Sequence, residues 1–505
     1  MFSPDTVRLK FSQTLGGIKS PSDTVKNPNN LKAAVEAPGG PRYGRPSDRY
    51  GPPTALFDKA LAVLQYDFDH LESLTPSTMN VRDAFDLVSL SAGFFSGEDV
   101  REVALRTPLQ ALLPDGGKWQ EPMVGGAVKP DGTWLEGFFV YMILETKNEP
   151  GLGGDPFAQG LAVYTKIINQ EQVLYPPPPP AGSPSTDPYL DQYSRFCSQS
   201  NLPIVLLSIA GNRLEVATAI FTEAVYADKL LSFDLRLGPH GPDNVLRVAR
   251  IFMAITKCAN GLRKLYGRLK ETSTILPSVI YPNPTADPPE SPIPQLEFFY
   301  KMNRAEGIPI KGAIDADNER HAIYLAKMKS DPSTGDSSTR DVLVKFSAKY
   351  NEAAHMLLAS QDPPLAPALY SCTRVVGGLY MVVMEYVSDA KPLHHFFYSS
   401  ALSSPPTAEV IRQDLTKALD LLGGRDFVFG DLRQVNILYS PDKDRAYLVD
   451  FDGVGKHGED RYSPCLNPKA GLGVERWQIM EKKHDRENLE RVMEWLSEGL
   501  SLISQ

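Results

Sequence analysis

The pattern of apolar and polar positions divides the first half of the chain into predicted helices and strands. From Ala55 onward, leucines and a phenylalanine recur at the spacing of one helical face, which predicts the first packed helix. The apolar run at 138–144 is rich in aromatic and branched residues and predicts a buried strand. Asp155 followed by Pro156 has the form of a helix start, which predicts a helix over 155–169.

The segments that follow predict a hairpin and a long helix. Residues 202–209 and 213–221 are apolar runs separated by Ala-Gly-Asn, a sequence typical of a turn between paired strands. Residues 243–269 carry apolar side chains at helical spacing, which predicts an amphipathic helix. Together these elements predict one α/β domain over residues 53–271.

Two segments lack the pattern of a packed element. Residues 1–52 mix proline, glycine, serine and asparagine with scattered charge, a composition that predicts a disordered tail. Residues 272–295 contain seven prolines and little apolar periodicity. This composition predicts a proline-rich linker between two domains.

The last part of the chain predicts a second domain over residues 296–505. Apolar runs at 341–346 and 379–387 predict strands, and residues 408–422 predict an amphipathic helix. A final helix is predicted over residues 485–500, where leucine, valine and methionine fall on one face. The chain as a whole is therefore predicted to be of the α+β class.

Length and composition exclude several classes of protein. At 505 residues the chain is too long for one ordinary domain. Its 4 cysteines lie far apart, so neither a structural zinc site nor a disulfide framework is expected. The net charge of −9 gives no general attraction to nucleic acid. Because no apolar run reaches the roughly 20 residues that cross a bilayer, we expect an intracellular protein, cytoplasmic or nuclear, without a membrane partner.

The sharpest chemical pattern is a set of oxygen-bearing side chains between residues 427 and 452. Asp431 is followed five positions later by Asn436, and an apolar strand then leads to Asp450. Phosphoryl transfer needs a group that orients the attacking hydroxyl and oxygen ligands that hold Mg²⁺ on the phosphates. We predict that Asp431 orients the hydroxyl and accepts its proton, and that Asn436 and Asp450 ligate the metal. Arg433 would neutralise charge on the transferred phosphate. The alternative is a surface turn in which these side chains cap local backbone.

These residues resemble the eukaryotic protein-kinase superfamily, and more closely the divergent fungal kinase-like domains and the aminoglycoside phosphotransferase branch, which use a Gly-Asp catalytic loop. The resemblance covers residues 298–500 and implies a bilobal fold that binds ATP and Mg²⁺. It implies that Lys345 contacts the nucleotide phosphates as a catalytic residue and forms a salt bridge with Glu352. It also implies that the backbone around Glu385 and Val387 holds the edge of the adenine. The alternative for Lys345 is an edge lysine that extends to water.

The sequence departs from the pattern of this family in several ways. Only Gly307 and Gly312 lie where a glycine-rich phosphate-binding loop is expected. Phe429-Gly430 replaces the usual His-Arg before the catalytic aspartate, and Asp452 replaces the glycine of Asp-Phe-Gly. No Ala-Pro-Glu motif follows. We therefore expect no control by phosphorylation of an activation loop, and the phosphate acceptor stays open.

A second candidate site combines two acids and a lysine. Pro130-Asp131 is followed by a spacer and then by Glu145-Thr-Lys147 at the end of the predicted strand. Because side chains alternate along a strand, Glu145 and Lys147 share one face. There the two acids would bind a metal, and Lys147 would activate water for phosphodiester hydrolysis. The alternative is ordinary ion pairing at a surface.

This second pattern resembles the PD-(D/E)XK nuclease superfamily over residues 85–225. The resemblance implies a site for Mg²⁺ or Mn²⁺, nucleic acid as a partner, and polar roles for Gln159 and Tyr164. It also calls for an upstream glutamate, for which Glu98 and Glu102 are both candidates. A nuclease-like domain followed by a kinase-like domain is similar to the architecture of Crinkler-related fungal proteins.

Taken together, the patterns predict an ATP- and Mg²⁺-dependent phosphotransferase that acts on Ser/Thr hydroxyls of a protein substrate and carries a nuclease-like N-terminal domain. Two other interpretations stay open. One is a kinase-like binding module that has lost catalysis. The other is a metal-dependent nuclease whose kinase-like domain is regulatory.

Overall fold

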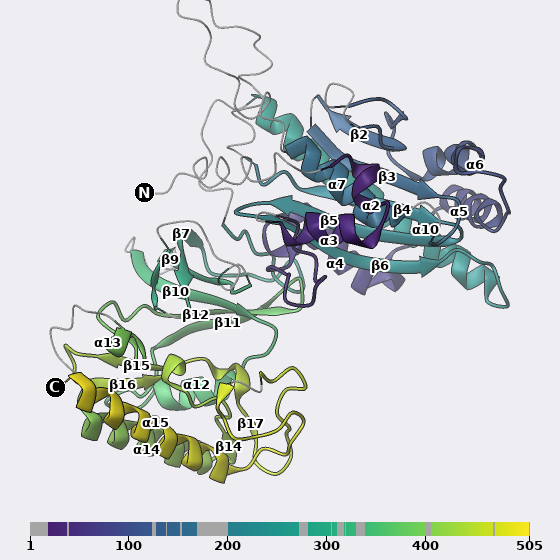
Figure 1. The fold of residues 1–505 in the computed structure, drawn as a ribbon. Coiled ribbons are helices and arrows are strands. Elements are labelled where there is room, and N and C mark those ends of the chain that lie inside the picture. Colours follow the sequence, from purple (N-terminus) through teal and green to yellow (C-terminus); the bar gives the residue numbers. More distant parts are fainter. Residues whose placement is uncertain are drawn as a thin grey trace, which may run out of the picture. The chain divides into compact units, whose positions relative to one another are not determined.

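The computed structural model describes residues 19–37, 40–123, 128–137, 139–151, 154–168, 200–271, 281–304, 306–310, 318, 320–329, 339–398, 406–467 and 470–503. The chain divides into two compact units. Unit 1 comprises residues 1–291 and 311–320, and unit 2 comprises residues 292–310 and 321–505. Both units mix helices with sheets, which confirms the predicted α+β class (Figure 1).

Unit 1 is built on a six-stranded sheet in the order β1-β2-β3-β4-β5-β6. The strands are β1 (Lys118–Trp119), β2 (Gly132–Glu136), β3 (Phe139–Lys147), β4 (Ile204–Ala210), β5 (Arg213–Phe221) and β6 (Val225–Asp234). Strands β3 and β4 pair in parallel, and the other neighbours pair antiparallel. A parallel pair needs a crossover connection, and helix α7 (Pro156–Ile168) lies in that connection.

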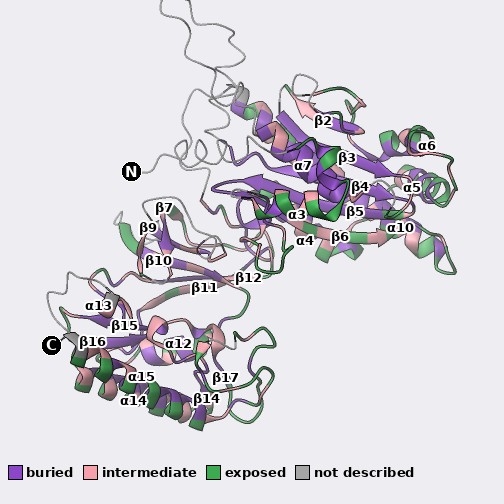
Figure 2. Ribbon diagram, viewed as in Figure 1, coloured by how far each residue is buried: buried purple, intermediate pink, exposed green. Residues whose placement is uncertain are grey.

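Helices cover this sheet and bury its central strands. Both α7 and the long helix α10 pack on β3, which is buried along its whole length (Figure 2). The helices and short 3₁₀ turns of unit 1 are α2 (Pro21–Val25), α3 (Pro28–Glu36), η1 (Thr54–Leu56), α4 (Lys59–Asp69), η2 (Leu71–Ser73), α5 (Thr78–Ser91), α6 (Glu98–Leu112), α7 and α10 (Gly241–Glu271).

Several local predictions are confirmed in unit 1. Strand β3 matches the apolar run, and β4 and β5 form the predicted hairpin. Asp155 caps α7, because its Oδ1 accepts hydrogen bonds from the N–H groups of Phe157 (2.9 Å) and Ala158 (3.2 Å). Helix α10 matches the predicted amphipathic helix.

The prediction of a disordered tail over residues 1–52 is wrong for the part that the structure describes. Helices α2 and α3 form there, and α2 packs on α7 and buries Val25. Arg42 forms a β-bridge with Tyr226. The contacts that stabilise this segment are made with α7 and with Tyr226, which are distant in sequence. The local apolar pattern therefore did not indicate that the segment is ordered. Residues 1–18 lie outside the described residues.

The segment predicted as a linker lies partly outside the described residues. Residues 281–291 of that segment are described and belong to unit 1. The N–H of Asn283, for example, donates a 2.9 Å hydrogen bond to the carbonyl oxygen of Leu56.

Unit 2 begins with an antiparallel six-stranded sheet in the order β11-β12-β10-β9-β7-β8. Its strands are β7 (Leu296–Asn303), β8 (Ile308–Pro309), β9 (Ile323–Lys329), β10 (Thr339–Ser347), β11 (Leu369–Val375) and β12 (Leu379–Glu385), with helix α12 (Glu352–Ala359) between β10 and β11. Strands β10 and β12 confirm the two strands predicted in this region.

The rest of unit 2 is mainly helical, with two small sheets, β13-β15-β16 and β14-β17. Its elements are β13 (Lys391–Pro392), α13 (His395–Tyr398), α14 (Ala408–Gly423), β14 (Phe427–Val428), η4 (Gln434–Asn436), β15 (Ile437–Ser440), β16 (Arg445–Leu448), η5 (Phe451–Gly453), β17 (Gly455–Lys456) and α15 (Lys482–Ile503). Helices α14 and α15 confirm two predictions and lie side by side (Figure 1).

One apolar core joins these elements of unit 2. It contains Leu358 of α12, Leu415 of α14, Leu448 of β16, Phe451 of η5 and Leu496 of α15. The turn that carries Phe451 is therefore fixed from several sides, and so are the polar residues next to it. Among the helices formed by described residues, none has the length and apolar character needed to cross a membrane.

Candidate functional site

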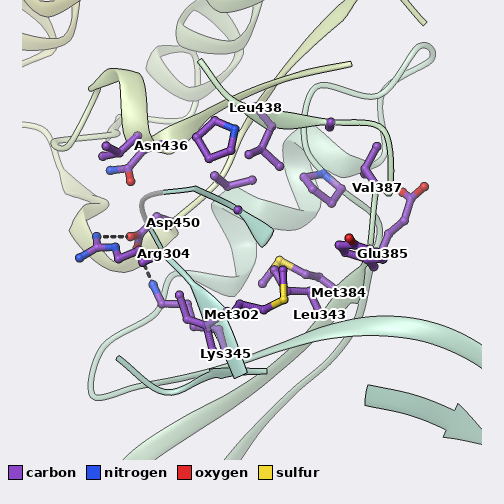
Figure 3. Close-up of a pocket in the computed structure, with 18 of the residues that line it drawn as sticks. Met302, Arg304, Leu343, Lys345, Met384, Glu385, Val387, Asn436, Leu438 and Asp450 are labelled. Atoms are coloured by element: carbon purple, nitrogen blue, oxygen red, sulfur yellow. Dashed lines mark hydrogen bonds and ion pairs between the residues drawn. The ribbon is translucent and has the colours of Figure 1, made fainter. Parts of the chain in front are cut away.

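A cavity in unit 2 lies between its large sheet and the strands that follow. Its empty space is about 810 Å³ when the open solvent at its mouth is included. One side is lined by apolar side chains, among them Leu343, Met384 and Leu438. Lys345 and Asp450 line the other side (Figure 3). The cavity therefore offers an apolar surface and a charged surface to one ligand.

Asp450 is held by two cations. The Lys345 Nζ lies 2.5 Å from its Oδ1, and the Arg304 Nη2 lies 2.8 Å from its Oδ2 (Figure 3). Lys345 comes from β10, Arg304 directly follows β7, and Asp450 follows β16. Burial alone would raise the pKa of Asp450, but the Lys345 ammonium and the Arg304 guanidinium hold that pKa well below its usual value. Asp450 is therefore a carboxylate at neutral pH.

Lys345 has a second carboxylate partner in Asp452. Its Nζ lies 2.6 Å from the Asp452 Oδ2, and the Ser347 Oγ donates a 2.5 Å hydrogen bond to the same oxygen. Burial, which Lys345 opposes, raises the pKa of Asp452 to about 6. Burial would lower the pKa of Lys345, but the two aspartates raise it, so the lysine is an ammonium.

Asp431 is fixed by the side chains that follow it. The guanidinium of Arg433 binds both of its carboxylate oxygens, at 2.5 and 2.7 Å. The Nδ2 of Asn436 donates to the backbone oxygen of Asp431 at 2.9 Å and to its Oδ2 at 2.7 Å. Because Asn436 also lines the cavity, these contacts connect Asp431 to the charged side of the cavity.

The segment before Asp431 is held by Asp485, at the beginning of α15. Its two carboxylate oxygens accept the backbone N–H groups of Phe429 (2.7 Å) and Gly430 (2.9 Å). Burial, opposed by these two hydrogen bonds, raises the pKa of Asp485 to about 6. Gly430 has a φ of +77°, and a Cβ there would lie 2.7 Å from the Gly453 oxygen, so glycine is required.

The cavity of unit 2 brings together residues that the sequence predicted for a nucleotide site. Lys345, Asn436 and Asp450 line one cavity, although Lys345 and Asp450 are 105 positions apart. Glu385 and Val387 line the same cavity, away from the ion pairs (Figure 3).

The backbone of Glu385 contributes to the local structure. Its N–H donates a 2.8 Å hydrogen bond to the carbonyl oxygen of Ala368. The side chain also contacts Ala368, because its Oε2 accepts the Ala368 N–H at 3.2 Å. Val387 is buried at the end of this stretch.

The predicted salt bridge between Lys345 and Glu352 is wrong. Glu352 is exposed at the first position of α12, whereas Lys345 binds Asp450 and Asp452. The face of α12 that packs inward begins with Ala354 and His355. Glu352 is the first residue of the helix and does not belong to the buried face, which is formed by Ala354, His355 and Leu358. Its side chain therefore faces solvent.

Sequence reasoning missed Arg304 and Asp485. Arg304 lies 146 positions from Asp450, and Asp485 lies 55 positions from Gly430. No local pattern indicates either contact. The only signal for Arg304 was its position just before Gly307, where a phosphate-binding loop was expected. Gly312, the other glycine of that region, lies outside the described residues.

The candidate site of unit 1 forms around the end of β3. The Oδ2 of Asp131 accepts hydrogen bonds from the N–H and the Oγ1 of Thr146, at 2.6 and 2.7 Å. The Glu145 Oε2 accepts a 2.7 Å bond from the Gln159 Nε2, and the Lys147 Nζ lies 2.7 Å from the Glu98 Oε1. The structure thus brings the predicted polar residues of β3 and α7 together.

Glu145 is the most unusual group of this site. Its side chain is fully buried, and its Oε1 has no hydrogen-bond partner in the described part of the chain. Burial raises the pKa of Glu145 well above its usual value, the Asp131 carboxylate raises it further, and Lys147 opposes this. Burial also raises the pKa of Asp131. A buried acceptor without a donor is costly, and a cation or a water would remove that cost.

The upstream acids and Tyr164 have different environments. Glu98 pairs with Lys147, whereas Glu102 binds Arg106 at 2.6 Å and also accepts a bond from Gln120. The hydroxyl of Tyr164 donates a 2.8 Å bond to the carbonyl oxygen of Leu202. That hydroxyl therefore supports the packing of α7 next to β4.

Among the described residues, no group of three or more His, Cys, Asp or Glu side chains could hold a metal ion. Mg²⁺ usually binds one or two carboxylates and completes its shell with waters and phosphate oxygens. Asp450 with Asn436, and Asp131 with Glu145, are pairs of that size.

No protein-family model and no curated protein sequence matches the chain. Among solved structures, the chain is similar to the kinase PK-1 of Cydia pomonella granulovirus, at 20% identity and a TM-score of 0.27. The match covers 35% of this chain and 63% of the viral kinase.

Proposed function

We propose that unit 2 is an ATP- and Mg²⁺-dependent phosphotransferase of the protein-kinase type, with Ser/Thr hydroxyls of a protein as acceptors. One observation carries the proposal. Lys345, Asn436 and Asp450 meet on one side of a single cavity whose other side is apolar. This is the combination of surfaces that a nucleotide with a bound cation requires.

The residues of the cavity fit such a ligand. The apolar side chains, including Leu343 and Leu438, match the faces of a purine. Lys345 and Arg304 supply positive charge for phosphate oxygens, and Asp450 and Asn436 are the candidate metal ligands. Bound Mg²⁺ would neutralise phosphate charge during transfer.

The residues near Asp431 support the transfer step itself. Asp431 is the candidate group that orients the acceptor hydroxyl and takes its proton. Arg433 and Asn436 fix its carboxylate, and Asp485 fixes the backbone before it. The base is thereby held in one orientation before a substrate binds, which is the condition for efficient proton transfer.

The first test is nucleotide-dependent stability of the full-length protein. With Mg-ATP at 100 times its Kd, binding to the folded state alone stabilises unit 2 by about 2.7 kcal/mol. We expect the midpoint of thermal unfolding to rise with Mg-ATP, and to rise less with ATP and EDTA. The Asp450→Asn variant should lose this dependence on Mg²⁺. An unchanged midpoint at millimolar Mg-ATP would contradict the proposal.

A second function, metal-dependent cleavage of nucleic acid, is proposed for unit 1. The observation that favours it is the buried Oε1 of Glu145, which has no hydrogen-bond partner among the residues that the structure describes and lies near Asp131 and Lys147. Two carboxylates and a lysine at one strand end fit the hydrolysis of a phosphodiester by a metal-activated water. In this alternative, the kinase-like unit regulates the nuclease.

Incubation of the full-length protein with DNA or RNA and Mg²⁺ or Mn²⁺ tests this second function. We expect Lys147→Ala and Glu145→Gln to reduce cleavage by about 100-fold or more, because each removes a group that acts on the water or the metal. Asp86→Asn is the matched control, because Asp86 is exposed on α5 of the same unit and its loss should leave cleavage unchanged. Cleavage that persists in both unit 1 variants would exclude this site.

A further inference from the structure

Lys345 has two carboxylate partners, and they are not equivalent. The following inference rests on the proposed function of unit 2. If Asp450 ligates Mg²⁺, its carboxylate is shared between the metal and Lys345, and its ion pair with Lys345 is weakened. Asp452 does not line the cavity, whereas Asp450 does, so Asp452 stays available to the lysine.

We propose that Asp452 is the positioning residue of Lys345, in the role that a helix glutamate was expected to have. Asp452 holds the Lys345 ammonium in a position where it faces the nucleotide phosphates, and Asp450 is left to bind the metal. The replacement of glycine by Asp452 in the Asp-Phe-Gly position is then the change that compensates for the exposed Glu352.

The geometry around Asp452 supports this role. Lys345 and Ser347 are two positions apart on β10, so their side chains leave the strand on the same face. Both contact the same Asp452 oxygen, at 2.6 and 2.5 Å. The serine thus fixes the carboxylate, and the carboxylate in turn fixes the lysine.

The other oxygen of Asp452 gives an independent indication. Its Oδ1 is buried and has no hydrogen-bond partner in the described part of the chain. The charge of Asp452 is therefore compensated through Oδ2, by Lys345 and Ser347. Because a partly buried carboxylate is stabilised by such donors, the contact with Lys345 is strongly favoured.

A consequence concerns control of the site. In this arrangement the position of Lys345 is set by a contact between β10 and the turn η5, with no contribution from the side chain of Glu352. Because His355 of α12 stacks on Phe451, next to Asp452, movement of α12 would reach the lysine through η5 and not through Glu352.

The test compares Asp452→Asn with Glu352→Gln in the full-length protein. Asp452→Asn should weaken Mg-ATP binding about tenfold, measured by titration, and raise KM more than it lowers kcat. Asp452→Glu should restore part of the affinity, and Ser347→Ala should give a smaller loss. Glu352→Gln is the matched control and should have no effect. If Asp452 acted only through its negative charge, Asp452→Asn would instead bind Mg-ATP more tightly, because the substitution removes a negative charge near the phosphates.

A measurement without nucleotide separates this inference from the proposed function. Acylation of Lys345 by an amine-reactive ester, followed by peptide mass spectrometry, should be several-fold faster in Asp452→Asn and unchanged in Glu352→Gln. Wild-type protein that does not bind Mg-ATP would overturn the proposed function, and acylation would still decide the inference. Unchanged acylation and unchanged or tighter Mg-ATP binding in Asp452→Asn, or an effect of Glu352→Gln alone, would overturn it.

Discussion

The Asp431→Asn variant is expected to bind Mg-ATP as the wild type does and to transfer phosphate about 100-fold to 10,000-fold more slowly. Asparagine keeps the shape of the side chain but cannot accept the proton of an attacking hydroxyl. Arg433 and Asn436 both bind the Asp431 carboxylate and fix its position. The substitution therefore removes the ability to accept a proton from a side chain whose position is already fixed. The measurement is transfer of labelled phosphate to protein, with Mg-ATP affinity determined in parallel.

The matched control for this prediction is Asp442→Asn. Asp442 is exposed in the turn between β15 and β16, in the same unit, and its loss should change neither binding nor transfer. Transfer that persists in Asp431→Asn would exclude Asp431 as the base. Wild-type protein that binds Mg-ATP without any transfer would instead support the interpretation of unit 2 as a binding module that has lost catalysis.

The Asp485→Ala variant is expected to lose about 2–6 kcal/mol of the free energy that keeps the segment before Asp431 closed. The substitution leaves the N–H groups of Phe429 and Gly430 buried without their acceptors, and each such group costs about 1–3 kcal/mol. Gly430 has a left-handed φ, and a glycine can adopt many other conformations, so the segment depends on these hydrogen bonds to keep this one. Transfer activity should fall as well, because Asp431 would lose its fixed position.

Hydrogen exchange of the peptide over 427–432, followed by mass spectrometry, measures this effect directly. We expect its exchange in Asp485→Ala to be faster than in the wild type by a factor that corresponds to the lost free energy. Glu487→Ala is the matched control, because Glu487 is exposed on the same helix. Unchanged exchange at this peptide would show that Asp485 does not hold the segment.

Local sequence signals were sufficient to predict contacts between residues that are close in sequence. The capping of α7 by Asp155 and the hairpin of β4 and β5 follow from residues within a few positions of one another. Strand β10 follows from a short apolar run. Helices α14 and α15 follow from a period of 3.6 residues, which requires only that one face of each helix be buried. The spacing of Asp431 and Asn436 likewise brought two side chains into hydrogen-bond contact.

Local signals failed where burial depends on a distant partner. Helices α2 and α3 lie in a segment of weak apolar pattern, and packing of α2 on α7 orders part of that segment. Glu352 was chosen as the partner of Lys345 because it lies on the next helix along the chain. The carboxylate that binds the lysine instead comes from Asp452, on a turn 105 positions beyond Ser347.

The amino-acid sequence by itself therefore determined the type of most elements and the chemical groups available for a phosphate site. Only the tertiary structure decided that Arg304, Lys345 and Asp450 meet, that Asp485 supports the segment before Asp431, and that Glu352 faces solvent. The physical reason is that hydrogen bonds and apolar periodicity within an element are local. Ion pairs between elements depend on how a shared core packs those elements together, and no short stretch of sequence encodes that packing.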